Sequence, residues 1–239
     1  MMNRDITETQ LAELHLYDGL EEDPCTGENF LIPGPAGVLE ALMECPNDYQ
    51  PGDPIAVVCH PHSLYGGSMA NKVVHIIADT FNAMGLPTLR FNFRGVGHSQ
   101  GRFDHGRGEV QDLLAAVDWF RQRYPGAPLW LAGFSFGAFV AFSAHRQAEA
   151  ERLLLVAPPV SMFDFSALNQ VDVPWMVIQG GKDEISLPER VSNWVHRHRN
   201  PPQYHWLGDA DHFFHGRLNR VRDAIKDSWG MALADDGVV

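Results

Sequence analysis

PLWLAGFSFGAFVAF, at residues 128–142, is the stretch that decides the fold. Its first part, Pro128–Ala132, is an apolar run that predicts a buried strand, and Ala138–Phe142 is apolar nearly all round, which is typical of a buried helix. Between them, residues 133–137 match the pattern G-x-S-x-G. In a strand-turn-helix of this kind the serine lies on a sharp turn, and the positions two before and two after it must be small. Ser135 is therefore the candidate nucleophile.

A second match to the same pattern lies at residues 97–101, which read GHSQG. Here loop residues precede the motif at Arg94–Gly97 and follow it at Arg102–Gly108, so no strand leads in and no helix leads out. We expect the Ser99 hydroxyl to bond backbone groups in a glycine-rich turn.

The remaining pattern predicts alternating strands and helices. The expected strands are Phe30–Ile32 and Val38–Glu44, joined as a hairpin, then Ile55–Cys59, Thr88–Phe93, Leu129–Ala132, Leu153–Ala157, Trp175–Gln179 and a weaker Tyr204–Leu207. Apolar stripes at helical spacing lie over Met69–Met84, Val110–Phe120, Ala138–His145 and Leu218–Trp229, and a capping box at Ser186–Glu189 predicts a further helix. We expect an α/β fold with a mostly parallel central sheet, an N-terminal antiparallel hairpin and helices on both faces.

Length and charge bound the organisation and the partners. The chain has 239 residues, and we expect one domain over residues 28–239 after an acidic extension over residues 1–27, where a short helix at Leu11–Leu16 is considered. The net charge is −12, and eight acidic residues lie in the first 30 positions beside one basic residue. An acidic chain without a basic block is a poor partner for nucleic acid or an anionic membrane. No feature of the sequence indicates an oligomeric state.

We expect neither a membrane-spanning segment nor a signal peptide. No apolar run reaches 18 residues, and the first residues lack the apolar core of a signal peptide. The three cysteines, Cys25, Cys45 and Cys59, show neither a C-x-x-C pair nor zinc spacing. Reduced thiols in the cytoplasm are therefore the expectation.

A serine nucleophile needs a base and an acid that orients it, and in this fold the chain order is Ser, acid, His. Asp183 follows the expected strand at Trp175–Gln179, with Glu184 as its rival, since only one of two adjacent turn residues can face the base. His212 lies in the loop after the weak last strand. We expect Ser135, Asp183 and His212 to form a catalytic triad.

The reaction also needs donors for the oxyanion of its intermediate. The backbone N–H of Phe136, which follows the nucleophile, is expected to be one donor. The other is expected from the loop after the strand Ile55–Cys59, at His62, Ser63 or Leu64, because Pro61 has no N–H.

A metal site is the competing interpretation of the same region. His60 and His62 form an H-x-H pattern, and with Asp183, His212 and His215 they are the residue types that hold Zn²⁺. A metal site leaves the serine unexplained, so we expect neither a metal nor another cofactor.

Three motifs together resemble a known family. The run HPHSLYGGSMANKV at residues 60–73, RGVGHSQG at 94–101 and GFSFG at 133–137 are similar to the small lid-less α/β-hydrolases with an H-P-H-P-x-x-G-G loop. Ser63 stands where those proteins usually have proline. The resemblance covers the chain from residue 28 to the last helix, and it implies a serine hydrolase with a Ser-Asp-His triad.

The interval between the sixth and seventh strands bears on the substrate. Residues 158–173 are too few for a helical cap, so the site should be open and shallow. We expect a small-molecule substrate, a short acyl ester or thioester, and six side chains are candidates for the walls: Tyr65, Phe134, Phe136, Met162, Phe163 and Phe213. A peptidase or acyltransferase using the same triad, and a non-catalytic member that binds a small molecule or a protein, are the alternatives.

Overall fold

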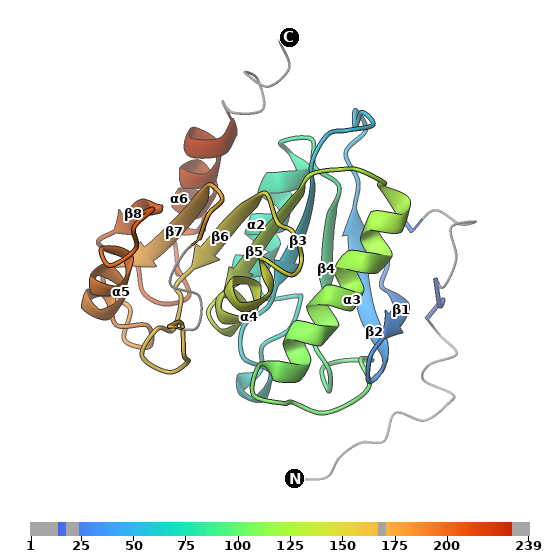
Figure 1. The fold of residues 1–239 in the computed structure, drawn as a ribbon, viewed down its shortest axis with the longest axis horizontal. Helices are drawn as coiled ribbons and strands as arrows, with labels where there is room; N and C mark the ends of the chain where they lie inside the picture. Colours follow the sequence, from blue (N-terminus) through green and yellow to red (C-terminus); the bar gives the residue numbers. More distant parts are fainter. Residues whose placement is uncertain (1–13, 18–23, 167–170, 231–239) are drawn as a thin grey trace.

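One eight-stranded sheet organises the residues that the computed structural model describes, which are 14–17, 24–166 and 171–230. The strand order is β1-β2-β4-β3-β5-β6-β7-β8 (Figure 1). The strands are β1 (Phe30–Gly34), β2 (Gly37–Glu44), β3 (Ile55–Cys59), β4 (Thr88–Phe91), β5 (Leu129–Phe134), β6 (Arg152–Val156), β7 (Trp175–Gly180) and β8 (Gln203–Leu207).

The strand directions confirm the predicted topology. β1 and β2 form an antiparallel hairpin, β2 runs antiparallel to β4, and every other neighbouring pair is parallel. The five residues of β3 and the six of β5 are all buried, which explains why these strands read as continuous apolar runs.

Helices cover both faces of the sheet. They are α2 (Lys72–Asn82), α3 (Arg107–Arg123), α4 (Phe136–Ala144), α5 (Pro188–Val195) and α6 (Leu218–Ile225), with the short turns η1 (Ser63–Tyr65) and η2 (Lys226–Gly230). Buried residues of α3, α4 and α5 share one core cluster, and those of α2 and α6 share the other. In Figure 1, α3 and α4 lie in front of the sheet and α2 lies behind it. The two layers hold the carboxyl ends of the parallel strands in fixed positions.

Two local predictions are wrong. The capping box at Ser186 does not form, because the Ser186 hydroxyl donates to the Ala157 carbonyl at 2.9 Å and α5 begins at Pro188 without a side-chain cap. The strand predicted to reach Phe93 ends at Phe91. The Asn92 N–H still donates to the Glu40 carbonyl at 2.8 Å, but the Phe93 N–H donates to His60 Nε2 at 2.9 Å and not to a neighbouring strand.

Described parts of the acidic extension contact the domain. Leu16 forms an isolated parallel bridge with Leu31 of β1, and the Trp119 indole donates to the Tyr17 carbonyl at 2.7 Å. The helix considered at Leu11–Leu16 lies mostly outside the described residues.

The expectation of three reduced thiols is wrong for two of them. Cys25 and Cys45 form a disulfide, with their Cα atoms 5.8 Å apart, because the β1–β2 hairpin pairs Phe30 with Ala41 and places the residues before β1 beside those after β2. Their separation of 20 residues carries no recognisable spacing signal. Cys59 is a buried free thiol at the end of β3, and burial raises its pKa. The cysteines therefore do not indicate a reducing compartment by themselves.

The segment between β6 and β7 contains no cap domain. Its described residues, 157–166 and 171–174, hold only turns and bends. Within the described part of the chain, no helix is long and apolar enough to span a bilayer.

Candidate active site

Ser135 lies on a sharp turn between β5 and α4. Its φ of 55° and ψ of −119° place it in a region that non-glycine residues rarely adopt, at a cost of about 1–3 kcal/mol. The flanking glycines make the turn possible. A Cβ atom at Gly133 would overlap the Gly137 carbonyl, and one at Gly137 would overlap the Cys59 carbonyl. Small residues are therefore required on both sides of the serine, because the backbone approaches each of these two positions too closely for a side chain.

His212 joins the serine to an acid. Its Nε2 lies 3.0 Å from Ser135 Oγ, and its Nδ1 lies 2.8 Å from Asp183 Oδ2. All three side chains are buried, with residue exposures of 7% or less. Three residues from the ends of β5, β7 and β8 therefore form one continuous chain of hydrogen bonds.

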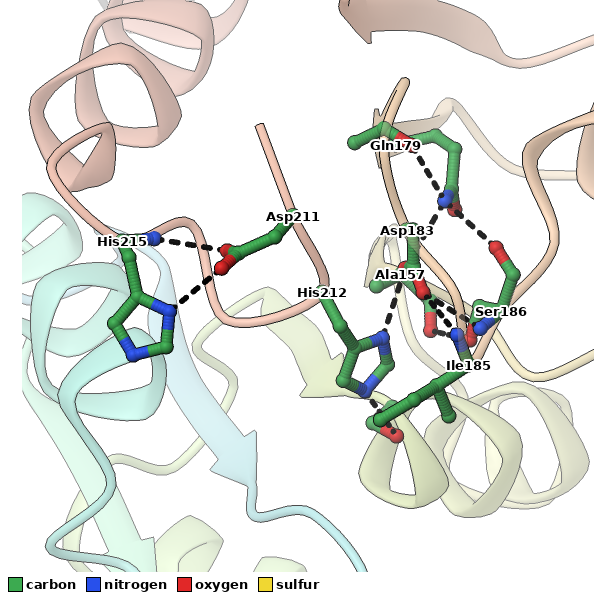
Figure 2. A network of polar contacts seen from close by, with 10 residues as sticks. Ala157, Gln179, Asp183, Ile185, Ser186, Asp211, His212 and His215 are labelled. Carbon is green, nitrogen blue, oxygen red and sulfur yellow. Dashed lines mark hydrogen bonds and ion pairs between the residues drawn. The ribbon is translucent and has the colours of Figure 1, made fainter. Parts of the chain in front are cut away.

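The surroundings of Asp183 explain why it, and not Glu184, faces the histidine. Asp183 Oδ1 accepts the backbone N–H groups of Ile185 and Ser186 at 2.8 and 2.7 Å (Figure 2). Its Oδ2 accepts from the Gln179 amide at 3.1 Å and faces His212. The Glu184 residue is exposed. The turn thus fixes one carboxylate toward the ring and directs the next residue to solvent.

Gln179 is a residue of the site that sequence reasoning missed. It is fully buried at the end of β7, and its Nε2 lies within 3.1 Å of Asp183 Oδ2 and of the carbonyls of Gly180 and Ser186. The Gln179 side chain therefore links the end of β7 to Asp183 and to both ends of the turn that carries it. The available signal was a polar residue at the end of an otherwise apolar strand.

The acid supplies our first prediction. In Asp183→Asn, the two backbone N–H groups hold the amide oxygen at the Oδ1 position, so the amide NH₂ faces His212 Nδ1. The ring then takes the tautomer that carries its proton on Nε2 and cannot accept one from Ser135. We expect kcat for an acyl ester to fall about 10⁴-fold. Glu184→Gln, an exposed neighbour, is the control and should keep the wild-type kcat; equal effects of the two variants would refute this role.

The loop after β3 holds the candidates for the second oxyanion donor. The Leu64 N–H donates to His62 Nδ1 at 3.2 Å, and the Leu64 residue is 68% exposed. The His62 carbonyl accepts the N–H groups of Tyr65 and Gly67, both at 3.1 Å. His62 lines the cavity beside Ser135, whereas Ser63 and Leu64 are not among its lining residues. The Leu64 N–H is thus occupied within its own loop.

His60 has both ring nitrogens engaged, which removes it from any metal-ligand set. The Phe93 N–H donates to its Nε2 at 2.9 Å, and its Nδ1 donates to the Pro61 carbonyl at 2.6 Å in the tautomer that satisfies both. Among the residues in the described ranges, the only group whose possible ligand atoms converge is Glu44, His75 and Asp79, which shares no member with the histidines considered above. His60 instead connects the loop after β3 to the end of β4.

This buried ring predicts a pH dependence of stability. Burial lowers the pKa of His60 to about 4, from an ordinary value near 6.5. Between pH 6.5 and 4 the unfolded chain binds a proton at this ring that the folded chain does not bind. The free energy of unfolding should therefore decrease as the pH falls through this window, by about 3 kcal/mol for His60.

Urea unfolding at several pH values measures this effect. His60→Gln, which donates and accepts hydrogen bonds without titrating, should show a shallower pH dependence than wild type. Parallel curves for wild type and His60→Gln would contradict the prediction.

Ser99 takes the structural role expected of it. Its hydroxyl donates to the Asn92 carbonyl at 2.6 Å and accepts the Glu40 N–H at 2.9 Å. It is 2% exposed. Of the two G-x-S-x-G serines, Ser135 is the one whose hydroxyl is hydrogen-bonded to a histidine ring.

A cavity of about 340 Å³ opens beside Ser135. Five of the six side chains expected at its walls line it, and these are Tyr65, Phe136, Met162, Phe163 and Phe213. Phe134 is instead fully buried and packs against the His212 ring, with 5.1 Å between ring centroids. The site is thus an apolar cavity with the serine and histidine at its polar end.

This fold is that of the serine hydrolases, in which a serine on a sharp strand-to-helix turn is hydrogen-bonded to a histidine ring. Comparison with known proteins agrees. Residues 52–165 match the family model described as serine aminopeptidase, S33. The uncharacterized protein RP471 of Rickettsia prowazekii is 40% identical over 204 residues, which is 81% of this chain and 85% of that protein.

Two solved structures are similar over most of their length. An α/β serine hydrolase homologue from Coxiella burnetii is 41% identical, with a TM-score of 0.82 over 86% of this chain and 99% of that one. XC6422 from Xanthomonas campestris, described as an α/β serine hydrolase without a lid, is 40% identical. Its TM-score is 0.82 over 89% of this chain and 96% of that one. The chain belongs to the α/β-hydrolase superfamily.

Proposed function

We propose that the protein hydrolyses a carboxylic ester or thioester of a small acyl group through an acyl-enzyme on Ser135. The observation that carries this proposal is the chain of hydrogen bonds from Ser135 Oγ through His212 to Asp183. A serine hydroxyl becomes an effective nucleophile when such a base accepts its proton.

The geometry supports the following sequence of steps. Ser135 Oγ attacks the acyl carbon while His212 Nε2 takes the hydroxyl proton, and the C–O or C–S bond to the leaving group breaks as the ring returns that proton to it. Water, activated by the same ring, then cleaves the acyl-serine bond and releases the acid. Asp183 keeps the ring in the tautomer that both steps need.

Backbone donors stabilise the oxyanion in this proposal. Phe136 and His62 both line the cavity next to Ser135, and the Leu64 N–H is bonded within its loop. These facts favour the N–H groups of Phe136 and His62 as the pair. A donor of this kind contributes on the order of 3 kcal/mol to the transition state.

Peptidase activity is the alternative that the description of the matching family model suggests. An aminopeptidase must bind a protonated α-amino group, which calls for a carboxylate near the scissile bond. The described residues lining the cavity include neither Asp nor Glu. This lining favours an ester or thioester without a charged amine.

A panel of acyl p-nitrophenyl esters, acyl thioesters and aminoacyl p-nitroanilides tests the proposal. We expect turnover of esters or thioesters by wild type, and turnover at least about 10⁴-fold slower by Ser135→Ala. Turnover confined to the p-nitroanilides would favour the peptidase, and a wild type inactive on the whole panel would contradict the proposal.

A further inference from the structure

The cavity beside Ser135 is lined by apolar side chains contributed by several loops. Those side chains are Tyr65, Phe136, Met162, Phe163, Ile185 and Phe213. Of the described residues that line it, none is Lys, Arg, Asp or Glu. A charged group packed against these side chains would lose part of its hydration without gaining an ionic partner, which is costly.

The cavity has two sides, one close to His212 and one away from it. The leaving group must lie close to His212 Nε2, because the ring gives it a proton. Phe213 packs against this ring, with 5.1 Å between ring centroids, and Ile185 lines the cavity together with Ser135 and His212. Phe213 and Ile185 therefore flank the leaving group.

On the opposite side of the cavity, the loop after β6 meets the loop after β3. Phe136 and Phe163 pack with 5.2 Å between ring centroids, and the His62 ring contacts Phe136 at 5.0 Å. Met162 precedes Phe163, lines the same cavity and is 56% exposed. We name Phe136, Met162 and Phe163 the acyl wall.

Resting on the proposed function, we propose that the acyl wall binds an uncharged hydrocarbon acyl group longer than acetyl, and that Met162 sets the preference for longer acyl groups over acetyl. An acetyl group offers one methyl group to the wall, and a longer chain offers more apolar surface to the exposed Met162 side chain. Each further methylene that packs against the acyl wall is removed from contact with water, together with part of the Met162 side chain. Burial of one methylene is worth about a fourfold change in kcat/KM.

The test compares p-nitrophenyl acetate, butyrate and hexanoate, whose leaving group is constant, with the p-nitrophenyl monoester of succinic acid. For wild type, kcat/KM should rise about 15-fold from acetate to butyrate. The succinate monoester, which carries a carboxylate at the far end of its acyl chain, should react at least about 50-fold more slowly than butyrate.

Met162→Ser should lower the ratio of kcat/KM for hexanoate to that for acetate about fivefold. The ratio is taken on one enzyme, so a change in the amount of active protein cancels. Leu16→Ser is the matched control, since Leu16 is 43% exposed and pairs with Leu31 beside β1, away from the cavity lining. Its ratio should equal that of wild type.

Labelling by a fluorophosphonate separates failure of this inference from failure of the proposed function. If Ser135 is labelled but rates do not increase with acyl length, or the succinate ester matches butyrate, or Met162→Ser keeps the wild-type ratio, the assignment of the acyl wall is wrong and the hydrolase proposal stands. If Ser135 is not labelled, both fail.

Discussion

Ser135→Ala is expected to reduce kcat on any acyl ester by about 10⁴- to 10⁶-fold. The methyl group cannot attack the acyl carbon, and His212 loses the hydroxyl that lies 3.0 Å from its Nε2. The oxyanion donors remain, so the residual rate should stay above that of water alone. Initial rates with p-nitrophenyl butyrate, corrected for uncatalysed hydrolysis, measure the effect.

Ser99→Ala is a demanding control, because Ser99 occupies the same position in a second G-x-S-x-G motif. Losing its two buried hydrogen bonds should cost about 1–3 kcal/mol of stability. Its kcat per folded molecule should remain close to wild type. A larger loss of kcat in Ser99→Ala than in Ser135→Ala would reverse the assignment of the nucleophile.

The second large effect concerns stability. Gly137→Ala should lower the free energy of unfolding by at least about 3 kcal/mol, because the added methyl overlaps the Cys59 carbonyl. Relief requires β3 and the start of α4 to separate, and both are buried in the core. Urea unfolding followed by circular dichroism measures the change.

Gly230→Ala provides the matched control for that substitution. A Cβ at Gly230 meets no atom of the described residues within 4 Å, and its φ is not in the left-handed region. Its free energy of unfolding should stay within about 0.5 kcal/mol of wild type. Equal stabilities for Gly137→Ala and wild type would show that the turn does not need the contact described here.

Prediction from sequence worked where one local pattern determines the structure. Continuous apolar runs located β3 and β5, since both faces of these strands are covered. The serine turn was predictable because its glycines, strand and helix are adjacent in the chain. The loops after β7 and β8 were predicted from their position at strand ends, and they bring Asp183 and His212 together.

Other features depend on contacts between distant segments. Gln179 reads as an ordinary strand residue until the turn that it supports is known. Ser186 fits a capping box by sequence, yet its hydroxyl donates to the end of β6. Cys25 and Cys45 pair because the β1–β2 hairpin, in the register Phe30 to Ala41, brings the segments before and after it together. The sequence left His62, Ser63 and Leu64 open as the second donor, and of these only His62 lines the cavity.

The most direct measurement is covalent labelling of the full-length protein with a fluorophosphonate, followed by mass spectrometry of its peptides. A serine activated by His212 should be phosphonylated at Ser135 to about one group per chain, and prior incubation with an excess of acyl ester should slow the reaction. Absence of label after long exposure, or label carried by Ser99 or another hydroxyl with Ser135 unmodified, would contradict a nucleophilic role for Ser135.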